Sequence, residues 1–389
     1  MTLIERQGFG AGGPALRRGL VELDCGPDGR PARFSEPRAL IRADSASELA
    51  AAFAAIEAAR AAGHWLAGYA SYDLGLALEP KLKPRLAAPR ENAPLLCFGV
   101  FDRPGPLTRE TPAETAQLSR PEPLWGLARY RRAFDAVRAY IAAGDTYQVN
   151  LTFPMAALWQ GDPRALFAAL AARQPVGHGA YVDLGGPILL SRSPELFFHL
   201  DADGTITARP MKGTAPRSPD PVEDGARARW LQNDIKNRAE NLMIVDLLRN
   251  DLSRLSQPGS VRVPVLFAVE TYATVHQMVS TVTARLVGRP TVEAIFRALF
   301  PCGSITGAPK IRAMEIIDDL EASPRGSYCG AIGWIAPDGS MDFNVAIRTL
   351  VLQPDGVAQL NVGGGVVYDS DAGGEYDEAL LKGRFAWLD

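Results

Sequence analysis

Four Asp-Gly pairs constrain the fold of this chain more than any other feature. They are Asp28-Gly29, Asp203-Gly204, Asp338-Gly339 and Asp355-Gly356, and each lies between short strand-like runs. Asp-Gly supplies the positive φ angles of a tight β-hairpin turn, so several strands are expected to pair antiparallel. A doubly wound parallel sheet needs strict alternation of strands and helices, which this chain lacks.

Apolar side chains recur at helical spacing in four segments. These stripes predict a helix that begins near Leu49 and ends at Gly63, and further helices over 127–141, roughly 225–254 and 375–387. Antiparallel hairpins grouped with a few long helices indicate an α+β fold, in which the sheets pack together and the helices lie outside.

Length and proline content bear on the domain organisation. A chain of 389 residues corresponds to two or three domains at ~150 residues each. The clearest break is Arg103–Pro123, which holds five prolines and almost no large apolar residue, and is expected to be a loop or linker. It divides the chain into an N-terminal segment, residues 1–123, and a larger remainder, residues 124–389.

Charge and residue counts argue against several classes of function. A net charge of -3 argues against nucleic acid or an anionic membrane as the main partner, and no apolar run reaches the ~18 residues that span a bilayer. The four cysteines and four histidines are widely spaced, which leaves no zinc ribbon, disulfide scaffold or local histidine metal motif. A metal is therefore expected to be held by carboxylates, which favours Mg²⁺, and the expected setting is a reducing cytoplasm.

Lys212 lies in the run Arg209-Pro-Met-Lys-Gly-Thr214 and has two interpretations. Pro210 and Gly213 place it on a rigid turn where the backbone can approach a ligand. It is either a solvated loop lysine, the commoner case, or a nucleophilic lysine made reactive by desolvation.

Charged residues near the C-terminus share one predicted helix face. Glu375, Glu378 and Lys382 are spaced i, i+3, i+7. They form either a solvent-facing pair, because a glutamate four residues before a lysine stabilises a helix by ~0.3 kcal/mol, or a Mg²⁺ ligand beside a carboxylate-binding ammonium. Glu240 is a second candidate metal ligand, although sequence spacing does not show that it meets Glu378.

Three further positions have both a structural and a chemical interpretation. Gly363–Gly365 form either a strand bend or a place where backbone N–H groups reach an anionic ligand. Arg348 lies in an apolar strand-like run and needs a carboxylate, either from the fold or from a substrate. Glu195 follows Ser193-Pro194 and is either a surface residue at a strand start or a general acid.

Together these motifs resemble those of the chorismate-utilising enzymes, the family of anthranilate synthase component I, aminodeoxychorismate synthase component I, isochorismate synthase and salicylate synthase. The resemblance runs from about Tyr147 to the C-terminus and is weaker before it, mainly at Gly68–Tyr72. The matching segments are residues 147–150, 191–195, 210–214, 239–251, 275–276, 303–315, 325–330, 347–349 and 363–365.

The resemblance implies one large globule of two packed antiparallel sheets with outer helices, to which both segments contribute. It implies that Glu240 and Glu378 bind Mg²⁺, with Glu375 supporting them through water. It also implies that Glu195 is the general acid/base. The positions implied to hold the substrate are Thr214, His276, Tyr328, Arg348, Gly363, Gly364, Gly365 and Lys382.

Two positions favour one reaction within the family. In the similar enzymes that add water to chorismate, a lysine stands at the position of Gln148. The glutamine of this chain therefore disfavours isochorismate and salicylate chemistry. In the anthranilate synthases that this family resemblance covers, the segment that matches residues 210–214 reads Pro-Ile-Ala-Gly-Thr. The aminodeoxychorismate synthases have a lysine at the position of Lys212. The resemblance therefore implies amination of chorismate to 4-amino-4-deoxychorismate for 4-aminobenzoate and folate synthesis, with Lys212 as a covalent nucleophile. Anthranilate synthesis is the alternative.

The sequence also bears on the source of ammonia. No G-x-C-x-G nucleophile elbow occurs in the chain, so ammonia is expected from a separate glutamine amidotransferase subunit. A non-catalytic chorismate-binding or scaffold protein is the distant alternative. It is disfavoured because all the residues implied to do chemistry are retained, namely Glu195, Lys212, Glu240 and Glu378.

Overall fold

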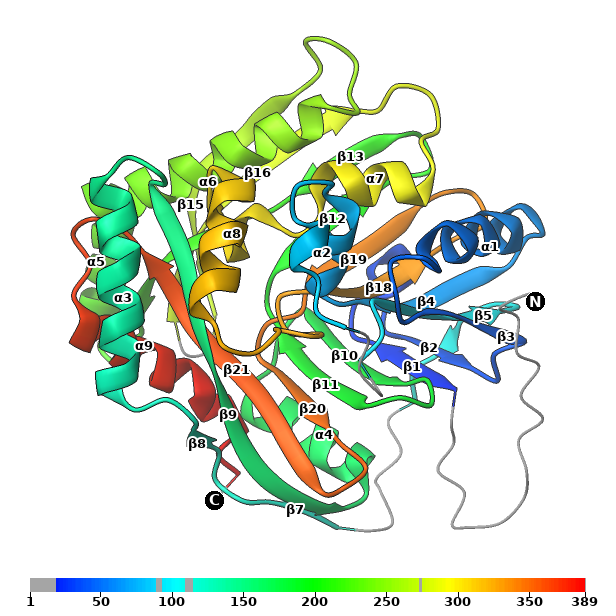
Figure 1. Ribbon diagram of the computed structural model, residues 1–389, viewed down its shortest axis with the longest axis horizontal. Coiled ribbons are helices and arrows are strands. Elements are labelled where there is room, and N and C mark those ends of the chain that lie inside the picture. Colours follow the sequence, from blue (N-terminus) through cyan, green and yellow to red (C-terminus); the bar gives the residue numbers. More distant parts are fainter. Residues whose placement is uncertain (1–18, 89–92, 109–114, 273–274, 389) are drawn as a thin grey trace.

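The computed structural model of the protein describes residues 19–88, 93–108, 115–272 and 275–388. In this part of the chain two large antiparallel sheets pack together in one globule, with helices on their outer faces (Figure 1). The α+β fold with two packed antiparallel sheets is therefore confirmed. No helix among the described residues is long and apolar enough to cross a membrane.

Sheet A has eleven strands within the described residues, in the order β17-β9-β21-β20-β11-β10-β1-β2-β6, with β7 and β8 also pairing with β9. Its strands are β1 Leu20–Leu23, β2 Ala32–Ser35, β6 Gly105–Pro106, β7 Ala116–Leu118, β8 Glu122–Pro123, β9 Gln148–Gly161, β10 His178–Asp183, β11 Ile188–Ser193, β17 Gly307–Ala308, β20 Thr349–Leu352 and β21 Val357–Val366.

Sheet B has ten strands within the same residues, in the order β14-β16-β13-β12-β19-β18-β4-β5-β3, with β15 also pairing with β16. Its strands are β3 Ala39–Ala43, β4 Trp65–Ala70, β5 Leu96–Phe101, β12 Leu196–Leu200, β13 Thr205–Ala208, β14 Met211–Pro216, β15 Arg262–Thr271, β16 Val275–Arg285, β18 Ala331–Ile335 and β19 Met341–Val345.

The helices divide between the outer faces of the two sheets. Side chains of α1, α2, α6 and α7 share a core with sheet B, those of α3, α4 and α9 share a core with sheet A, and α8 contributes to both. The α-helices are α1 Leu49–Ala61, α2 Asp73–Leu78, α3 Leu127–Ala142, α4 Pro163–Arg173, α5 Pro221–Asn233, α6 Ile235–Ser253, α7 Val292–Leu299, α8 Lys310–Leu320 and α9 Ala372–Gly383. Short 3₁₀ turns are η1 Pro27–Gly29, η2 Lys83–Arg85, η3 Gly303–Ile305 and η4 Arg384–Ala386.

A third core fills the space between the sheets. It joins Val21 and Phe34 of sheet A to Tyr69, Phe101 and Trp334 of sheet B. Because successive side chains of a strand point to opposite faces, each sheet buries one set of residues here and the other set under its helices. Both faces of both sheets are therefore largely apolar, and the polar residues on them stand out.

The four Asp-Gly pairs named above lie in turns between antiparallel strands, and a fifth, Asp224-Gly225, lies inside α5. The four turns have the following positions. They connect β1 to β2, β12 to β13, β18 to β19 and β20 to β21. The glycines have φ angles of 68°, 88°, 96° and 85°, in the region that favours glycine. The antiparallel pairing predicted from these pairs is confirmed.

The prediction of one continuous helix over residues 225–254 is wrong, because the structure has two helices there, α5 and α6. The chain breaks at Asp234, whose ψ of 122° is extended. Its carboxylate accepts a hydrogen bond from the N–H of Asn237 at 2.9 Å and so caps α6. The break sets where α6 begins, and α6 carries Glu240.

The Pro-rich stretch Arg103–Pro123 is not purely a loop. Its described part contains the short strands β6, β7 and β8, of which β6 pairs with β2 and the other two pair with β9. The described part of the N-terminal segment supplies strands to both sheets, because β1 pairs with β10 and β4 pairs with β18. The division of the chain at residue 123 stays a prediction.

Candidate active site

Helix α9 presents its charged residues toward strand β21. Asp371 caps the helix by accepting a hydrogen bond from the N–H of Gly374 at 2.8 Å. Lys382 Nζ lies 2.9 Å from Glu378 Oε1 and donates a hydrogen bond to the carbonyl of Gly363 at 3.0 Å. The i, i+4 pair predicted from the sequence is therefore present, and its ammonium also contacts the glycine-rich strand.

The glycines of β21 leave room for polar side chains from three other elements. A Cβ atom on Gly364 would lie 3.1 Å from Glu375 Oε2 of α9. On Gly365 it would lie 2.9 Å from Gln148 Nε2 of β9 and 3.3 Å from Lys212 Nζ of β14. Side chains of β9, β14 and α9 thus converge on one stretch of bare backbone, which is why glycine is needed there.

Lys212 lies at the centre of this convergence. Burial lowers the pKa of its amine, and the nearby ammonium of Lys382 lowers it further. The carboxylates of Glu240, Glu195 and Glu378 act in the opposite direction. Lys212 lies in strand β14 and not on the turn predicted from the sequence. Its side chain is half-buried, and three acids lie around its amine.

Helix α6 places Glu240 beside Lys212. Its next residue, Asn241, accepts a hydrogen bond from Ser280 of β16 at 2.6 Å and contacts the carbonyl of Lys212 at 3.5 Å. Burial raises the pKa of Glu240, and the carboxylates of Glu375 and Glu378 add to that effect.

Glu195 is buried at the start of β12. Hydrogen bonds from the Ser304 hydroxyl and the Met211 backbone reach its carboxyl group. Its other oxygen, Oε1, is buried without a hydrogen-bond partner among the residues that the structure describes. Burial raises the pKa of this carboxyl group, although Lys212 and Arg348 oppose the shift, so it favours the protonated form and can donate a proton.

Arg348 joins β19 to β20 in an unusual backbone conformation. Its φ is 49°, in the left-handed region, which costs a residue other than glycine roughly 1 kcal/mol or more. Burial lowers the pKa of its guanidinium, and Glu195 is the acid that opposes this shift. Within the described residues no ion pair engages this guanidinium, which leaves it available for a substrate carboxylate.

Among the described residues, no hydrogen bond or ion pair joins three of the expected substrate-binding residues to Lys212 or to the acids around it. Thr214 is exposed and donates to Gln277 Oε1 at 3.0 Å. His276 is buried, with its ring nitrogens 2.9 Å from Asp224 Oδ1 and 3.0 Å from Thr271 Oγ1. Burial raises the pKa of Tyr328, which lies near Arg325. Their roles stay predictions.

Three supporting residues had no assigned role in the sequence. They are Ser304, which holds Glu195, Asn241, which fixes α6 to β14, and Ser370, whose hydroxyl donates to Glu375 Oε1 at 2.7 Å. Ser304 and Asn241 lie inside the motifs that carry the family resemblance, and that was the only signal for them. Gln148 has both side-chain polar atoms buried without a partner in the described residues.

The carboxylates of Glu240, Glu375 and Glu378 match the oxygen ligands that Mg²⁺ prefers. Glu240 and Glu375 have pKa values raised by burial and by neighbouring carboxylates, so a divalent cation would relieve their repulsion. Within the described residues the oxygens of the three acids do not all lie within 4.8 Å of one another, and Glu378 is held by Lys382. The donor set fits Mg²⁺.

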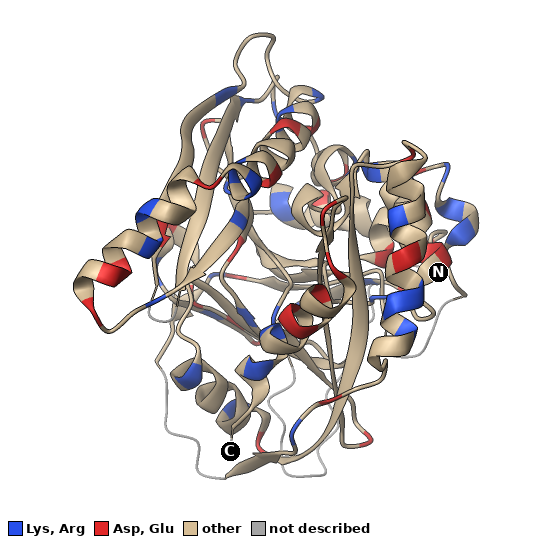
Figure 2. Cartoon of the chain, turned by 90° about the vertical axis from the view of Figure 1, so that its left-hand side faces the viewer, with Lys and Arg blue, Asp and Glu red and all other residues tan. Residues whose placement is uncertain are grey.

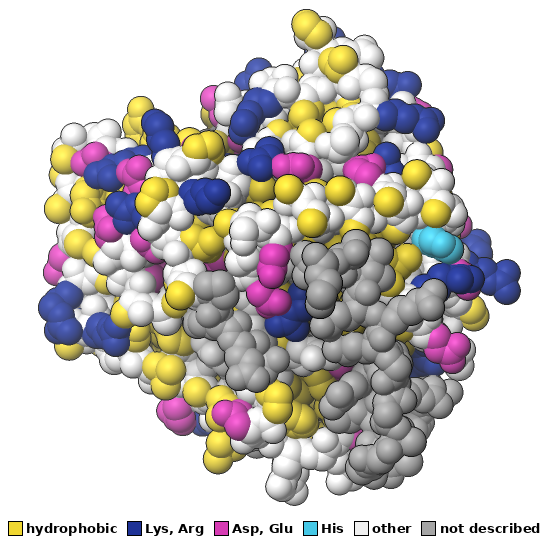
Figure 3. All heavy atoms as spheres, turned by 45° about the vertical axis from the view of Figure 1, so that its right-hand side comes forward, with side chains coloured by type: hydrophobic (Ala, Val, Ile, Leu, Met, Phe, Trp, Pro, Cys, Tyr) yellow, Lys and Arg dark blue, Asp and Glu magenta, His cyan; other side chains and the backbone are white. Residues whose placement is uncertain are grey.

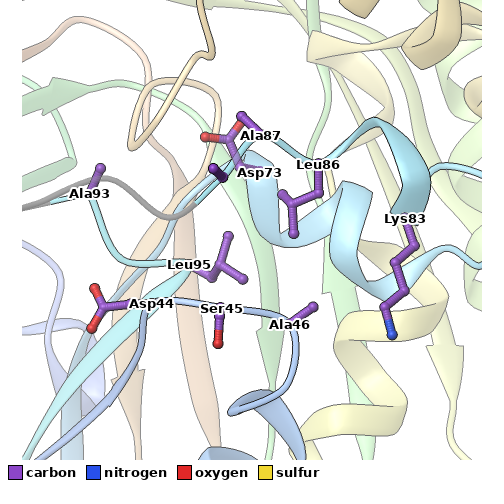
Figure 4. Close-up of a pocket in the computed structure, with 10 residues that line it drawn as sticks. Asp44, Ser45, Ala46, Asp73, Lys83, Leu86, Ala87, Ala93 and Leu95 are labelled. Atoms are coloured by element: carbon purple, nitrogen blue, oxygen red, sulfur yellow. The ribbon is translucent and has the colours of Figure 1, made fainter.

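A separate cavity of about 240 Å³ opens beside α2 and the loop that follows β3. Asp44, Asp73, Lys83 and Leu95 are among its lining residues (Figure 4). None of the residues of the Lys212 cluster lines it. Figure 2 marks both basic and acidic positions on several helices, and basic and acidic side chains are interspersed on the face drawn in Figure 3.

Comparison with known sequences shows a match to one family model, described as chorismate binding enzyme, over residues 27–387. Aminodeoxychorismate synthase component 1 of Klebsiella aerogenes is 46% identical over 272 residues, covering 70% of this chain and 58% of that protein. Anthranilate synthase component 1 of Streptomyces coelicolor is 42% identical over 288 residues, covering 72% and 54%. The chain thus spans little more than half the length of these curated relatives.

Solved structures show the same fold. Anthranilate synthase component I from Streptococcus pneumoniae superposes with a TM-score of 0.75 at 24% identity, covering 98% of this chain and 94% of that one. MenF, the menaquinone-specific isochorismate synthase of Escherichia coli, gives 0.75 at 16% identity, covering 95% and 88%. The family match over nearly the whole chain agrees with the two-sheet fold, and the chain belongs to the chorismate binding enzyme family.

Proposed function

We propose that this chain is an aminodeoxychorismate synthase component I, which aminates chorismate at C4. The observation that carries the proposal is Lys212, a desolvated amine that lies against Gly365 and faces Glu195, Glu240 and Glu378. The relatives named aminodeoxychorismate synthase component 1, at 46–47% identity, support the assignment.

Substrate binding would use the cationic side chains around the cluster. Chorismate carries two carboxylates, and two cationic side chains could pair with them. Arg348 lies near Glu195, and Lys382 lies near Lys212. Arg348 makes no ion pair within the described residues, and Lys382 is tied only to Glu378 and one carbonyl there. Binding of both carboxylates would fix the ring over the β21 glycines and hold its C2 near the lysine amine.

The first chemical step would form a covalent bond to Lys212. Its neutral amine attacks C2 of the ring, the two ring double bonds shift, and the C4–O bond breaks. Glu195, whose raised pKa favours the protonated form, gives its proton to the departing hydroxyl, which leaves as water. Glu195 then takes the surplus proton from the lysine nitrogen.

The second step would release the lysine. Ammonia attacks C4, the double bonds shift back, and the bond between C2 and Nζ breaks. Glu195 returns the proton to the lysine nitrogen and then takes the surplus proton from the new C4 ammonium group, which leaves 4-amino-4-deoxychorismate and the protonated acid for the next turnover. Two displacements by good nucleophiles thus replace one difficult exchange of hydroxyl for amine.

Mg²⁺ would be held by Glu240 and Glu378, with Glu375 alongside. When bound, such an ion fixes a substrate carboxylate and offsets its charge. The protein's own part is to orient these acids, through Ser370 for Glu375 and through Asn241 for the helix that carries Glu240.

Product identification tests the proposed function. The full chain is incubated with chorismate, Mg²⁺ and ammonium salt, and the products are separated and identified by mass and fluorescence. We expect 4-amino-4-deoxychorismate, with activity lost in EDTA and restored by Mg²⁺. Formation of anthranilate, the product of the relative that is 42% identical, would instead assign the chain to the other branch.

A further inference from the structure

A thiol, an imidazole and a carboxylate meet between the two sheets. Ligand atoms of Cys25, His178 and Asp342 lie within 4.8 Å of one another. The three residues border a cavity of about 10 Å³, which has room for a single ion or water molecule but not for an organic ligand. The proposed amination uses none of them.

Strand pairing and the packing of the sheets bring these residues together. The N–H of Asp24 donates to the carbonyl of Gly179 at 2.8 Å, which places the next residue, Cys25, beside His178 in sheet A. Asp342 lies in β19 of sheet B, opposite His199 of β12. In Figure 1, β1 and β10 lie in one sheet and β12 and β19 in the other.

The alternation of side chains along β10 and β19 directs His178 and Asp342 into the same space, and Cys25 lies in the bend that follows β1. Ala180 lies two residues after His178 and belongs to the core between the sheets. On β19 the neighbours of Asp342, Met341 and Phe343, point into the outer core under the helices. The side chain of Asp342 therefore faces the opposite sheet.

The imidazole has an unsatisfied nitrogen at this point. His178 Nδ1 is buried and makes no hydrogen bond within the described residues. Asp342 Oδ1 lies 3.9 Å away, too far for a hydrogen bond. The distance is shorter than about 4.2 Å, the sum of typical Zn–N and Zn–O bond lengths, so one ion can contact both atoms.

The surrounding residues hold these ligands in place. Asp342 Oδ2 is 2.9 Å from His199 Nδ1, and His199 Nε2 is 3.2 Å from Asp201 Oδ1. Asn344 Nδ2 donates to the carbonyl of His178 at 2.8 Å. Carboxylate and histidine chains of this kind orient metal ligands in known metal sites.

The protonation states also suit a cation. Burial lowers the pKa of His178, which keeps the ring neutral with a free lone pair. Burial, together with Asp342 and Asp24, raises the pKa of the Cys25 thiol to about 11. A divalent ion at this point would reverse the effect of the two carboxylates and displace the thiol proton to solvent.

We propose that Cys25 Sγ, His178 Nδ1 and Asp342 Oδ1 bind one zinc ion and so link the two sheets. Sulfur, nitrogen and oxygen donors in a site of this size match Zn²⁺ and disfavour Mg²⁺, which prefers oxygen ligands alone. The site is separate from the carboxylates of Glu240 and Glu378, which offer only oxygen.

Metal binding to the full chain tests the proposal. Protein stripped of metal is loaded with Zn²⁺, passed through a desalting column and assayed for retained zinc, and a parallel sample is loaded with Co²⁺ as a spectroscopic probe. We expect one zinc per chain and a sulfur-to-cobalt charge-transfer band. The Cys25→Ser variant is expected to lose the band, and Asp342→Asn to bind zinc at least tenfold more weakly.

Three control variants distinguish this site from zinc bound elsewhere on the chain. His64→Gln and Glu240→Gln lie outside the cluster and are expected to keep both the zinc and the band. His199→Gln is expected to keep the band but weaken binding about tenfold, because it removes only the orientation of Asp342. Far-UV circular dichroism checks that each variant is folded.

Three results would overturn the proposal. They are the absence of retained zinc in the wild type, equal retention by Cys25→Ser, and loss of the band in Glu240→Gln. Should Cys25→Ser fail to fold, cadmium NMR of the wild type decides, because a cadmium shift without a sulfur ligand contradicts the site.

Discussion

Lys212 is the reacting residue in the proposed mechanism, and its surroundings set the properties of its amine. Its Nζ lies close to Gly365, beside the amide of Gln148, with Lys382 as the nearest influential cation. A desolvated amine with a lowered pKa destabilises the folded state, but it is a better nucleophile because more of it is neutral. This trade-off is often found at catalytic sites.

The lowered pKa of Lys212 predicts how stability depends on pH. Between the lowered folded value and the ordinary lysine value of 10.5, the unfolded chain binds more protons, so the stability of the wild type rises with pH in that window. Lys212→Met is therefore expected to be about 1 kcal/mol more stable than the wild type at pH 7, with a difference that narrows toward pH 10.5. Urea unfolding at several pH values measures this.

The exposed lysine of α6 provides the control for that experiment. Lys236→Met is expected to change stability by less than about 0.5 kcal/mol at every pH. A Lys212→Met variant that is less stable than the wild type at pH 7 would contradict the inference that the amine of Lys212 destabilises the folded state.

Gly365 is the second residue that makes a sharp prediction. In Gly365→Ala the new methyl would meet the ends of two side chains, Gln148 and Lys212, at 2.9 and 3.3 Å. Those two side chains can move aside, so we expect near-normal stability. We also expect at least a tenfold loss of kcat in the chorismate assay, which is roughly the effect of displacing a reacting group by a fraction of an ångström. Gly105→Ala, with its nearest atom 3.9 Å away, is the matched control and is expected to stay active.

Helix α9 is the element that carries the most residues of the proposed site. It carries Glu375, Glu378 and Lys382, and it begins with a capping aspartate followed by two glycines in its first turn. Asp371→Ala is expected to cost about 1 kcal/mol of stability and to lower activity further than that loss alone would, because the three side chains lose their common orientation. Chemical unfolding and steady-state kinetics of the same preparation measure both effects.

Asp162→Ala is the control for this helix. Asp162 caps α4 through a 2.8 Å hydrogen bond from the N–H of Arg164, and α4 carries none of the proposed site residues. A similar stability loss without the loss of activity is expected. Equal loss of activity in both variants would contradict a specific role for α9.

Sequence patterns predicted the elements better than their junctions. The Asp-Gly turns gave four hairpins because positive φ is a local requirement, and α3 matches the apolar stripe of 127–141 closely. The apolar stripe continues across Asp234, however, so only the aspartate as a helix cap could have shown that α5 and α6 are separate. Short strands such as β6 exist through their partners and have no signal of their own.

At the scale of the whole molecule, both clusters of polar residues are products of topology. Lys212, Glu240 and Glu378 come from β14, α6 and α9, and no local spacing could show that they meet. Likewise the absence of a local Cys/His motif in the sequence did not reveal that Cys25 and His178 become neighbours when β1 pairs with β10. The family resemblance supplied the first cluster, and only the fold supplied the second.

The chain as a whole is expected to depend on a partner for glutamine. Burial raises the pKa of all four cysteine thiols, to about 11 for Cys25 and about 12 for Cys97, Cys302 and Cys329, so none resembles an activated nucleophile. We expect the purified chain to use ammonium salt but not glutamine, and to gain glutamine-dependent activity when an amidotransferase subunit is added. Release of glutamate from glutamine by the chain alone would contradict this.

The most direct test of the proposed mechanism is the mass of Lys212 itself during turnover. The full chain is quenched while it reacts with chorismate and Mg²⁺ without ammonia, then digested and mapped by tandem mass spectrometry. We expect the peptide that contains Lys212 to carry the mass of chorismate less one water, to lose it when ammonia is added, and to be unmodified in Lys212→Ala, which should also be inactive. An unmodified Lys212 together with undiminished activity of Lys212→Ala would contradict the proposed mechanism.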